Sequence, residues 1–160
     1  MGVVIPGVKN REDALNAVAA LKYAPEGNRP PGVDRATRYM GRIKEYMANA
    51  NQNMLVILTV DNEDFVRNLE SILSVQGIDV IHVGPLHLSS SMGLSIDAKE
   101  VKQSIEKIEI AAKNKGIPLG GAIAKYTQLN TLKKKGYRFL TVPGDMELLR
   151  HGVESFFSAP

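Results

Sequence analysis

Polar side chains follow the apolar stretches that the sequence predicts as strands. Lys9, Asp61, His87, Lys125 and Asp145 each come shortly after one such stretch. The carboxyl ends of parallel strands meet at one edge of a sheet, which is where such folds place their chemistry. Asp61 and His87 follow successive strands, so we expect their side chains to converge around a shared metal ion. One carboxylate and one imidazole would leave the remaining metal positions to water and substrate oxygens.

These residues and the other histidines also have structural interpretations. Asp61 could cap the helix that follows it, because Asp is favoured at helix N-termini. His87 could be an exposed loop residue. His82 lies within an apolar stretch and is expected to be a core residue whose ring finds hydrogen-bond partners. His151 is expected on the surface of the last helix.

The segment VIHVGPLHLSSSMG, residues 80–93, is the one around which the chain is organised. Val80–Val83 predicts a buried strand, which Gly84-Pro85 ends because Pro lacks a donor for the ladder. A polar loop with His87 and three serines is expected to follow. The serines could bind an anion, but a solvated turn or a helix cap explains them equally well. The sequence contains no legible Ser-His-Asp arrangement and neither phosphate-loop pattern.

The elements that must position these residues alternate along the chain. Short apolar stretches predict strands at 3–5, 54–60, 80–83, 117–123 and 139–142. Amphipathic stretches predict helices at about 10–22, 43–51, 63–73, 98–115, 126–135 and 145–157. This alternation specifies a parallel α/β sheet with right-handed crossovers. An eight-stranded barrel needs about 250 residues, so the chain predicts either an open doubly wound sheet or part of a barrel.

The composition favours one ordinary globular domain. The length of 160 residues predicts a single α/β domain spanning 1–160. A net charge of +3 and an aromatic content of 6% argue against a nucleic-acid partner. The one dense basic run, Lys133–Lys135, falls where a helix would end and cations are favoured. The absence of cysteine excludes disulfides and thiol nucleophiles. No apolar run reaches the roughly 20 residues of a membrane span, so we expect a cytoplasmic protein without a membrane partner.

Several ordered motifs resemble the HpcH/HpaI aldolase/citrate lyase family of the phosphoenolpyruvate/pyruvate barrels. GVVIPGVKNREDA resembles that family's fourth strand and turn. KYAPEGNRPPG, followed by RATRYMGRIKEYM, resembles its loop of the type RYPPxGxRG…RASRY. The stretch from LVILTVDNED to VGPLHLSSSMG resembles the family's LVQIETxEA…IGPxDLSxSMG, and GYRFLTVPGDMELLRHG resembles its last strand and helix. The resemblance extends through the whole chain.

The resemblance implies a partial (β/α)8 TIM barrel of about five parallel strands. Family members are divalent-metal-dependent lyases that make or break a carbon–carbon bond next to pyruvate or a related 2-oxo acid, and they are commonly homo-oligomers. Their metal polarises the keto oxygen of the substrate. The partners implied are thus a small 2-oxo acid and an aldehyde. The family's two metal ligands fall on Asp61 and His87, and its substrate-binding positions fall on Thr59, Gly84, Pro85 and Leu86.

Both metal positions depart from the family pattern. Asp61 replaces a Glu and shortens the reach of one ligand, whereas His87 replaces an Asp and removes a negative charge. The second change should weaken Mg²⁺ and favour softer ions such as Mn²⁺, Co²⁺ or Zn²⁺. Thr59 and Leu86 also differ from the usual residue types. The family's catalytic histidine and its substrate-binding arginine belong to three strands that this sequence does not include, so no catalytic residue is assigned.

Three functional hypotheses follow. The first is the carboxyl-terminal portion of a metal-dependent aldolase, expected to be a fragment of a longer gene product and inactive in isolation, unless another chain supplies the missing strands. The second is a barrel that has lost metal chemistry and acts as a binding or assembly protein. The third ignores the resemblance and assigns an open α/β module that binds a small anion at Gly84–Gly93.

Overall fold

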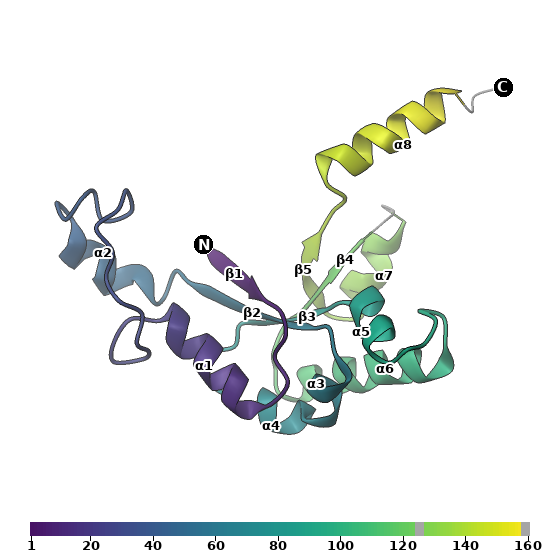
Figure 1. The fold of residues 1–160 in the computed structure, drawn as a ribbon, viewed down its shortest axis with the longest axis horizontal. Helices are drawn as coiled ribbons and strands as arrows, with labels where there is room; N and C mark the ends of the chain where they lie inside the picture. Colours follow the sequence, from purple (N-terminus) through teal and green to yellow (C-terminus); the bar gives the residue numbers. More distant parts are fainter. Residues whose placement is uncertain (124–126, 158–160) are drawn as a thin grey trace.

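Five strands in the described part of the chain form one parallel sheet. The computed structural model describes residues 1–123 and 127–157. The strands are β1 (Gly2–Ile5), β2 (Leu55–Val60), β3 (Val80–Val83), β4 (Leu119–Ala122) and β5 (Tyr137–Thr141). Their spatial order is β1-β2-β3-β4-β5, as Figure 1 shows. Each strand pairs with the next one in sequence, which is the order of a barrel. A doubly wound sheet would reverse direction at a switch point.

Helices separate the strands as the hydrophobic pattern predicts. They are α1 (Arg11–Leu21), α2 (Ile43–Ala50), α3 (Glu63–Arg67), α4 (Leu69–Leu73), α5 (Pro85–Ser91), α6 (Lys99–Asn114), α7 (Gln128–Lys134) and α8 (Asp145–Phe157). The helix predicted over 63–73 is divided at Asn68, whose backbone lies at φ −100° and ψ 15°. The side-chain Nδ2 of Asn68 donates to the carbonyls of Lys9 and Asp64. Such side-chain-to-backbone hydrogen bonds compete with regular helical geometry.

The prediction of a polar loop after β3 is wrong, because residues 85–91 form helix α5. Pro85 occupies its first position, where a fixed φ favours a helix and the missing N–H is not needed. Leu88 is fully buried in the core and anchors the helix. The Ser89 hydroxyl donates to the Leu86 carbonyl, and the Ser91 hydroxyl accepts from the N–H of Glu63. Two of the three serines therefore make internal contacts.

The two faces of the sheet have different surroundings. Alternate residues of a strand point to opposite faces, and one face of β2 and β3 packs against the helices. The side chains at its centre are at most 2% exposed: Val56, Leu58, Val60, Ile81 and Val83. The other face would point into a barrel. There Val4 and Leu55 are 45% and 44% exposed, although both are large and apolar.

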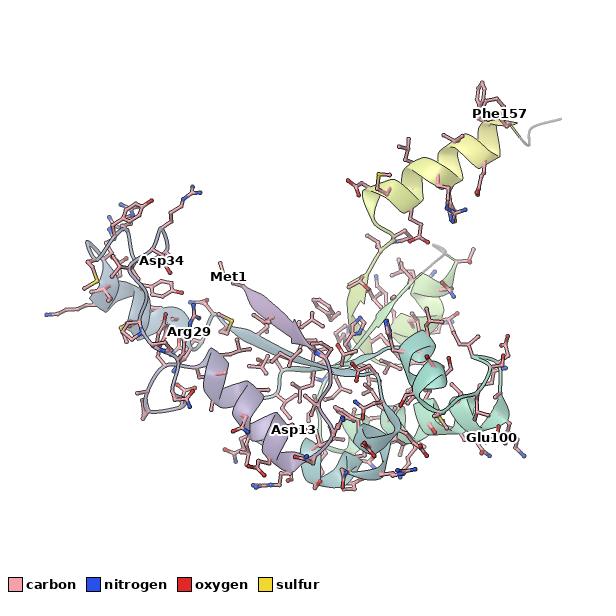
Figure 2. All side chains as sticks on the ribbon, viewed as in Figure 1. Met1, Asp13, Arg29, Asp34, Glu100 and Phe157 are labelled. Atoms are coloured by element: carbon pink, nitrogen blue, oxygen red, sulfur yellow. The ribbon has the colours of Figure 1, made fainter. Side chains whose placement is uncertain are left out.

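Helix α8 extends away from the sheet. No described residue of α8 is buried, and Figure 1 shows the helix projecting beyond β5. Figure 2 labels Phe157 at its far end, where that side chain is 80% exposed. The helix therefore leaves an apolar surface uncovered. None of the helices in the described residues has both the length and the hydropathy needed to cross a membrane.

Side chains that follow β2 hold the turn that follows β1. Asp61 Oδ2 accepts from the N–H of Gly7 at 2.9 Å, and Asn62 Nδ2 donates to the carbonyl of Val8 at 3.0 Å. Asn62 Oδ1 also caps α3 by accepting from the N–H of Phe65 at 2.9 Å. Asn62 thus joins the β1–α1 turn to the first turn of α3, at the edge where the strands end.

Replacing Asn62 should destabilise the fold measurably. We expect Asn62→Ala to lower the free energy of unfolding by about 2 kcal/mol, because it removes a helix cap and a tertiary hydrogen bond. Urea unfolding followed by circular dichroism measures the change. Asn16→Ala, at an exposed position within α1, is the matched control and should be neutral or slightly stabilising. Equal stability of the two variants would contradict this role.

Candidate active site

Gly84 lies where β2, β3 and α5 meet. Its N–H donates to the carbonyl of Val60 at 3.2 Å, which continues the pairing of β2 with β3. A Cβ atom on Gly84 would lie 3.5 Å from Cγ2 of Thr59 and 3.6 Å from Nδ1 of His87. Glycine therefore leaves a gap between these two side chains. The structure brings Thr59, Gly84 and His87 together, at the carboxyl ends of two neighbouring strands.

The first turn of α5 borders this gap. Gly84 is the N-cap residue, and no side chain caps the helix. Pro85 has no N–H, so the first amide of α5 belongs to Leu86. Free amides at a helix N-terminus attract carboxylates and other anions. The Leu86 side chain is 66% exposed and therefore lies at the rim of the site. The role of Pro85 and Leu86 in substrate binding stays a prediction.

Asp61 lies at the end of β2 but is oriented by the β1 turn. Besides the contact with Gly7, its Oδ1 accepts from Asn62 Nδ2 at 2.7 Å. Asn62, and not Asp61, caps the following helix. Asp61 and His87 form no hydrogen bond or ion pair with each other in the described residues. The convergence of Asp61 and His87 on one metal ion therefore stays a prediction.

The donor set fits part of a divalent-cation site. Each Asp61 oxygen accepts one hydrogen bond and retains a lone pair, and carboxylates that bind metals are commonly held by such contacts. His87 contributes an imidazole that lies beside the gap at Gly84. Within 1–123 and 127–157, however, no three His, Cys, Asp or Glu side chains are grouped to hold a metal. The chain offers two candidate ligands, which leaves other positions to water or substrate.

His82 contradicts the expectation of a hydrogen-bonded core histidine. Its two ring nitrogens are inaccessible to solvent and have no hydrogen-bond partner among the described residues. The ring packs edge-on against Phe139, with centroids 6.1 Å apart. A Cβ on Gly120 would lie only 3.2 Å from its Cδ2 atom, so glycine makes room for the ring. Burial lowers the pKa of His82, and the nearby His87 lowers it further.

Two of the other predicted strand-end residues, Lys9 and Asp145, make contacts within their own turns. The Lys9 N–H donates to Asp13 Oδ2 at 2.9 Å, so its backbone belongs to the start of α1. Asp145 begins α8 and accepts from the N–H of Met146. Lys125 lies outside the described residues. His151 is exposed on α8, as predicted. Of the five predicted strand-end residues, the structure thus places His87 at the gap and Asp61 at the adjacent strand end.

Together, the strand order and the strand-end site define a segment of a parallel β/α barrel. The family model described as "HpcH/HpaI aldolase/citrate lyase" matches residues 1–152. The chain belongs to this family. It is 39% identical over 163 aligned positions to the 4-hydroxy-2-oxo-heptane-1,7-dioate aldolase of Salmonella typhimurium strain LT2, with 96% of this chain and 59% of that protein covered. The chain therefore spans about 60% of the length of such relatives.

Solved structures agree with the family and with the partial barrel. A crystal structure of an HpcH/HpaI aldolase/citrate lyase family protein from Burkholderia cenocepacia J2315 superposes with a TM-score of 0.89 at 26% identity. The match covers 98% of this chain and 63% of that one. The citrate lyase beta subunit complexed with oxaloacetate and magnesium from M. tuberculosis has a TM-score of 0.56 at 11% identity, covering 91% of this chain and 57% of that one. The similarity to the mycobacterial subunit shows a shared fold.

The buried imidazole predicts a pH-dependent stability. The unfolded chain takes up a proton at His82 as the pH falls through 6.5, whereas the folded chain takes it up only at lower pH because the folded pKa is lowered. Stability that is fully present above pH 6.5 is therefore lost as the pH falls below that value. We expect His82→Phe to remove this component and to raise the urea midpoint at pH 7, because two unsatisfied nitrogens are eliminated.

Urea midpoints measured between about pH 5 and 8 test this expectation, since this window brackets the ordinary titration of histidine. His151→Gln, on the surface of α8, is the control and should keep the pH dependence of the natural protein. If the urea midpoint of His82→Phe falls with pH below 6.5 as steeply as that of the natural chain, His82 is not the group that causes the pH dependence.

Proposed function

We propose that this chain carries five β/α units of a divalent-metal-dependent carbon–carbon lyase that acts on pyruvate-type 2-oxo acids. The observation that carries the proposal is the gap at Gly84, bordered by Thr59, His87 and the uncapped start of α5. Membership of the aldolase/citrate lyase family supports the reaction class. The name of the Salmonella relative, an aldolase of a 2-oxo acid, supports the substrate class.

The residues around the gap suit the carboxylate end of a 2-oxo acid. The amide of Leu86 lies in the first turn of α5, where the helix dipole favours a negative charge. Gly84 and Pro85 place no long side chain in the path of a ligand that approaches this turn. The Cγ2 methyl group of Thr59 forms a wall of the gap, and Thr59 itself is only 9% exposed. This wall limits the size of the group that can lie against Gly84.

Asp61 and His87 would provide this chain's ligands to the divalent ion. When bound, that ion would supply Lewis acidity toward a substrate keto oxygen. The hydrogen bonds from Gly7 and Asn62 fix the carboxylate of Asp61 before any ion arrives. An imidazole at position 87 carries no negative charge in its neutral form. We therefore expect Mn²⁺ or Co²⁺ to be preferred over Mg²⁺, the ion named with the mycobacterial relative.

Metal titration by calorimetry tests this assignment. We expect Co²⁺ to bind the natural chain more tightly than Mg²⁺, and His87→Ala to weaken Co²⁺ binding by about tenfold or more, about 1.4 kcal/mol. His87→Asp should shift the preference back toward Mg²⁺, because it restores an oxygen ligand and a negative charge. Asp97→Asn, on an exposed loop, is the control and should leave Co²⁺ affinity unchanged.

The alternative is a family member without metal chemistry that acts as a binding or assembly protein. Two observations favour it: the changed residues at both metal positions, and the lack of a third ligand in the described residues. No Co²⁺ binding, or equal binding by the natural chain and His87→Ala, would reject the metal site and leave this second function as the better account.

We further propose that the protein is a homo-oligomer in which α8 contributes to the interface. Large exposed apolar patches mark association surfaces. The apolar side chains of α8 are 49% to 80% exposed: Met146, Leu148, Leu149, Val153, Phe156 and Phe157. A second copy of the chain would remove this surface from water.

Charge introduced on α8 should weaken the association. We expect Leu149→Asp combined with Phe156→Asp to lower the mass measured by light scattering after size exclusion. The unfavourable burial of two carboxylates is the physical reason. Glu147→Gln, on the same helix, is the control and should keep the mass of the natural chain. A natural chain that is monomeric, or a double variant with unchanged mass, would contradict the proposal.

A further inference from the structure

A basic cavity lies at the amino-terminal ends of strands β4 and β5, whereas the candidate active site lies at the carboxyl ends of β2 and β3. It has a volume of about 310 Å³ and is formed where α6 and α7 end and where β4 and β5 begin. Leu119, the first residue of β4, is 2% exposed and supplies an apolar floor. Ligand pockets in proteins have volumes of about 300–1,000 Å³. This cavity has the size for a small ligand.

Four cations from three elements line the cavity, and no acidic side chain does. They are Lys113 at the end of α6, Lys134 and Lys135 at the end of α7, and Arg138 on β5. The ammonium group of Lys135 is 3.0 Å from Glu109, which also accepts from the hydroxyl of Tyr137. In the part of the chain that the structure describes, the other three cations form no ion pair. Three exposed cations thus line one cavity without an acidic partner among the described residues.

The helix dipole explains only part of this arrangement. Cations are favoured at helix C-termini, which accounts for Lys113 and Lys134. Arg138 belongs to neither helix, and it brings a further positive charge from strand β5 into the same cavity. Terminal carbonyls of the helices are also satisfied without these side chains, since the N–H groups of Gly116 and Gly136 donate to the carbonyls of residues 113 and 133 at 3.1 Å. The three cations without an acidic partner are therefore free to contact an anion that enters the cavity.

The chemistry of the cations indicates the class of ligand. Arginine can bind two oxygens of a phosphate at once, and lysine adds a mobile point charge. We propose that this basic cavity binds a small molecule that carries a phosphate or polyphosphate group. The site is separate from the carboxyl ends of the strands and does not depend on the proposed lyase activity. A ligand held there would connect α6 to α7 and β5, and would stabilise the folded chain by binding it selectively.

Titration of inorganic pyrophosphate into the full chain at low ionic strength tests the proposal. We expect saturable binding that Lys134→Gln combined with Arg138→Gln weakens by about tenfold or more. Lys99→Gln combined with Arg11→Gln removes the same charge elsewhere on the surface, and should leave the affinity unchanged. Citrate, which offers carboxylates in place of phosphates, should bind more weakly than pyrophosphate.

Thermal unfolding gives a second readout that does not depend on heat of binding. Pyrophosphate should raise the melting temperature of the natural chain and of the control variant, but not of the cavity variant. The proposal is overturned if pyrophosphate does not bind, if both double variants lose affinity equally, or if citrate binds as tightly as pyrophosphate. Each of these results would mean that net charge, and not a shaped site, governs anion binding.

Discussion

The hydrogen bond from the N–H of Gly84 to the carbonyl of Val60 is the contact on which the candidate site depends. It extends the pairing of β2 with β3 beyond the last strand residue, and it fixes where α5 begins. Because a Cβ at Gly84 would lie 3.3 Å from the Val60 carbonyl oxygen, only glycine allows this approach without displacement of a neighbour. The gap between Thr59 and His87 is a direct consequence, as is the position of the α5 amides beside it.

Patterns within a single element could be predicted from the sequence. Strand β3 and helix α8 have the predicted limits, because apolar runs closed by Gly and Pro leave few alternatives. Helix α5 does not follow from the local sequence pattern. Its three serines indicate a loop, whereas its stability comes from Pro85 at the first position and from Leu88 packed in a core that the local sequence does not reveal. The division of the helix at Asn68 likewise depends on a distant carbonyl, that of Lys9.

The site was predictable to the extent that parallel strands share an edge. Asp61 directly follows β2 and His87 lies in the helix that follows β3, in line with this rule, whereas Thr59 and Gly84 enter the site only through the family resemblance. The orientation of Asp61 could not be predicted, because it is set by an N–H that lies 54 residues away in the sequence. The prediction that His82 finds hydrogen-bond partners fails for a similar reason. Whether a strand histidine finds partners depends on its neighbours in the sheet, here Gly120 and Phe139, which offer none.

If the proposed lyase function is right, the strand-end site supports chemistry at the methyl carbon of pyruvate. The most direct test joins this chain to the part of the Salmonella aldolase that lies outside the matched region, and follows the methyl protons of pyruvate in deuterated water by NMR. We expect exchange that requires added Mn²⁺ or Co²⁺ and that exceeds the rate with metal alone. A folded chimera that shows no exchange at any metal concentration would contradict it.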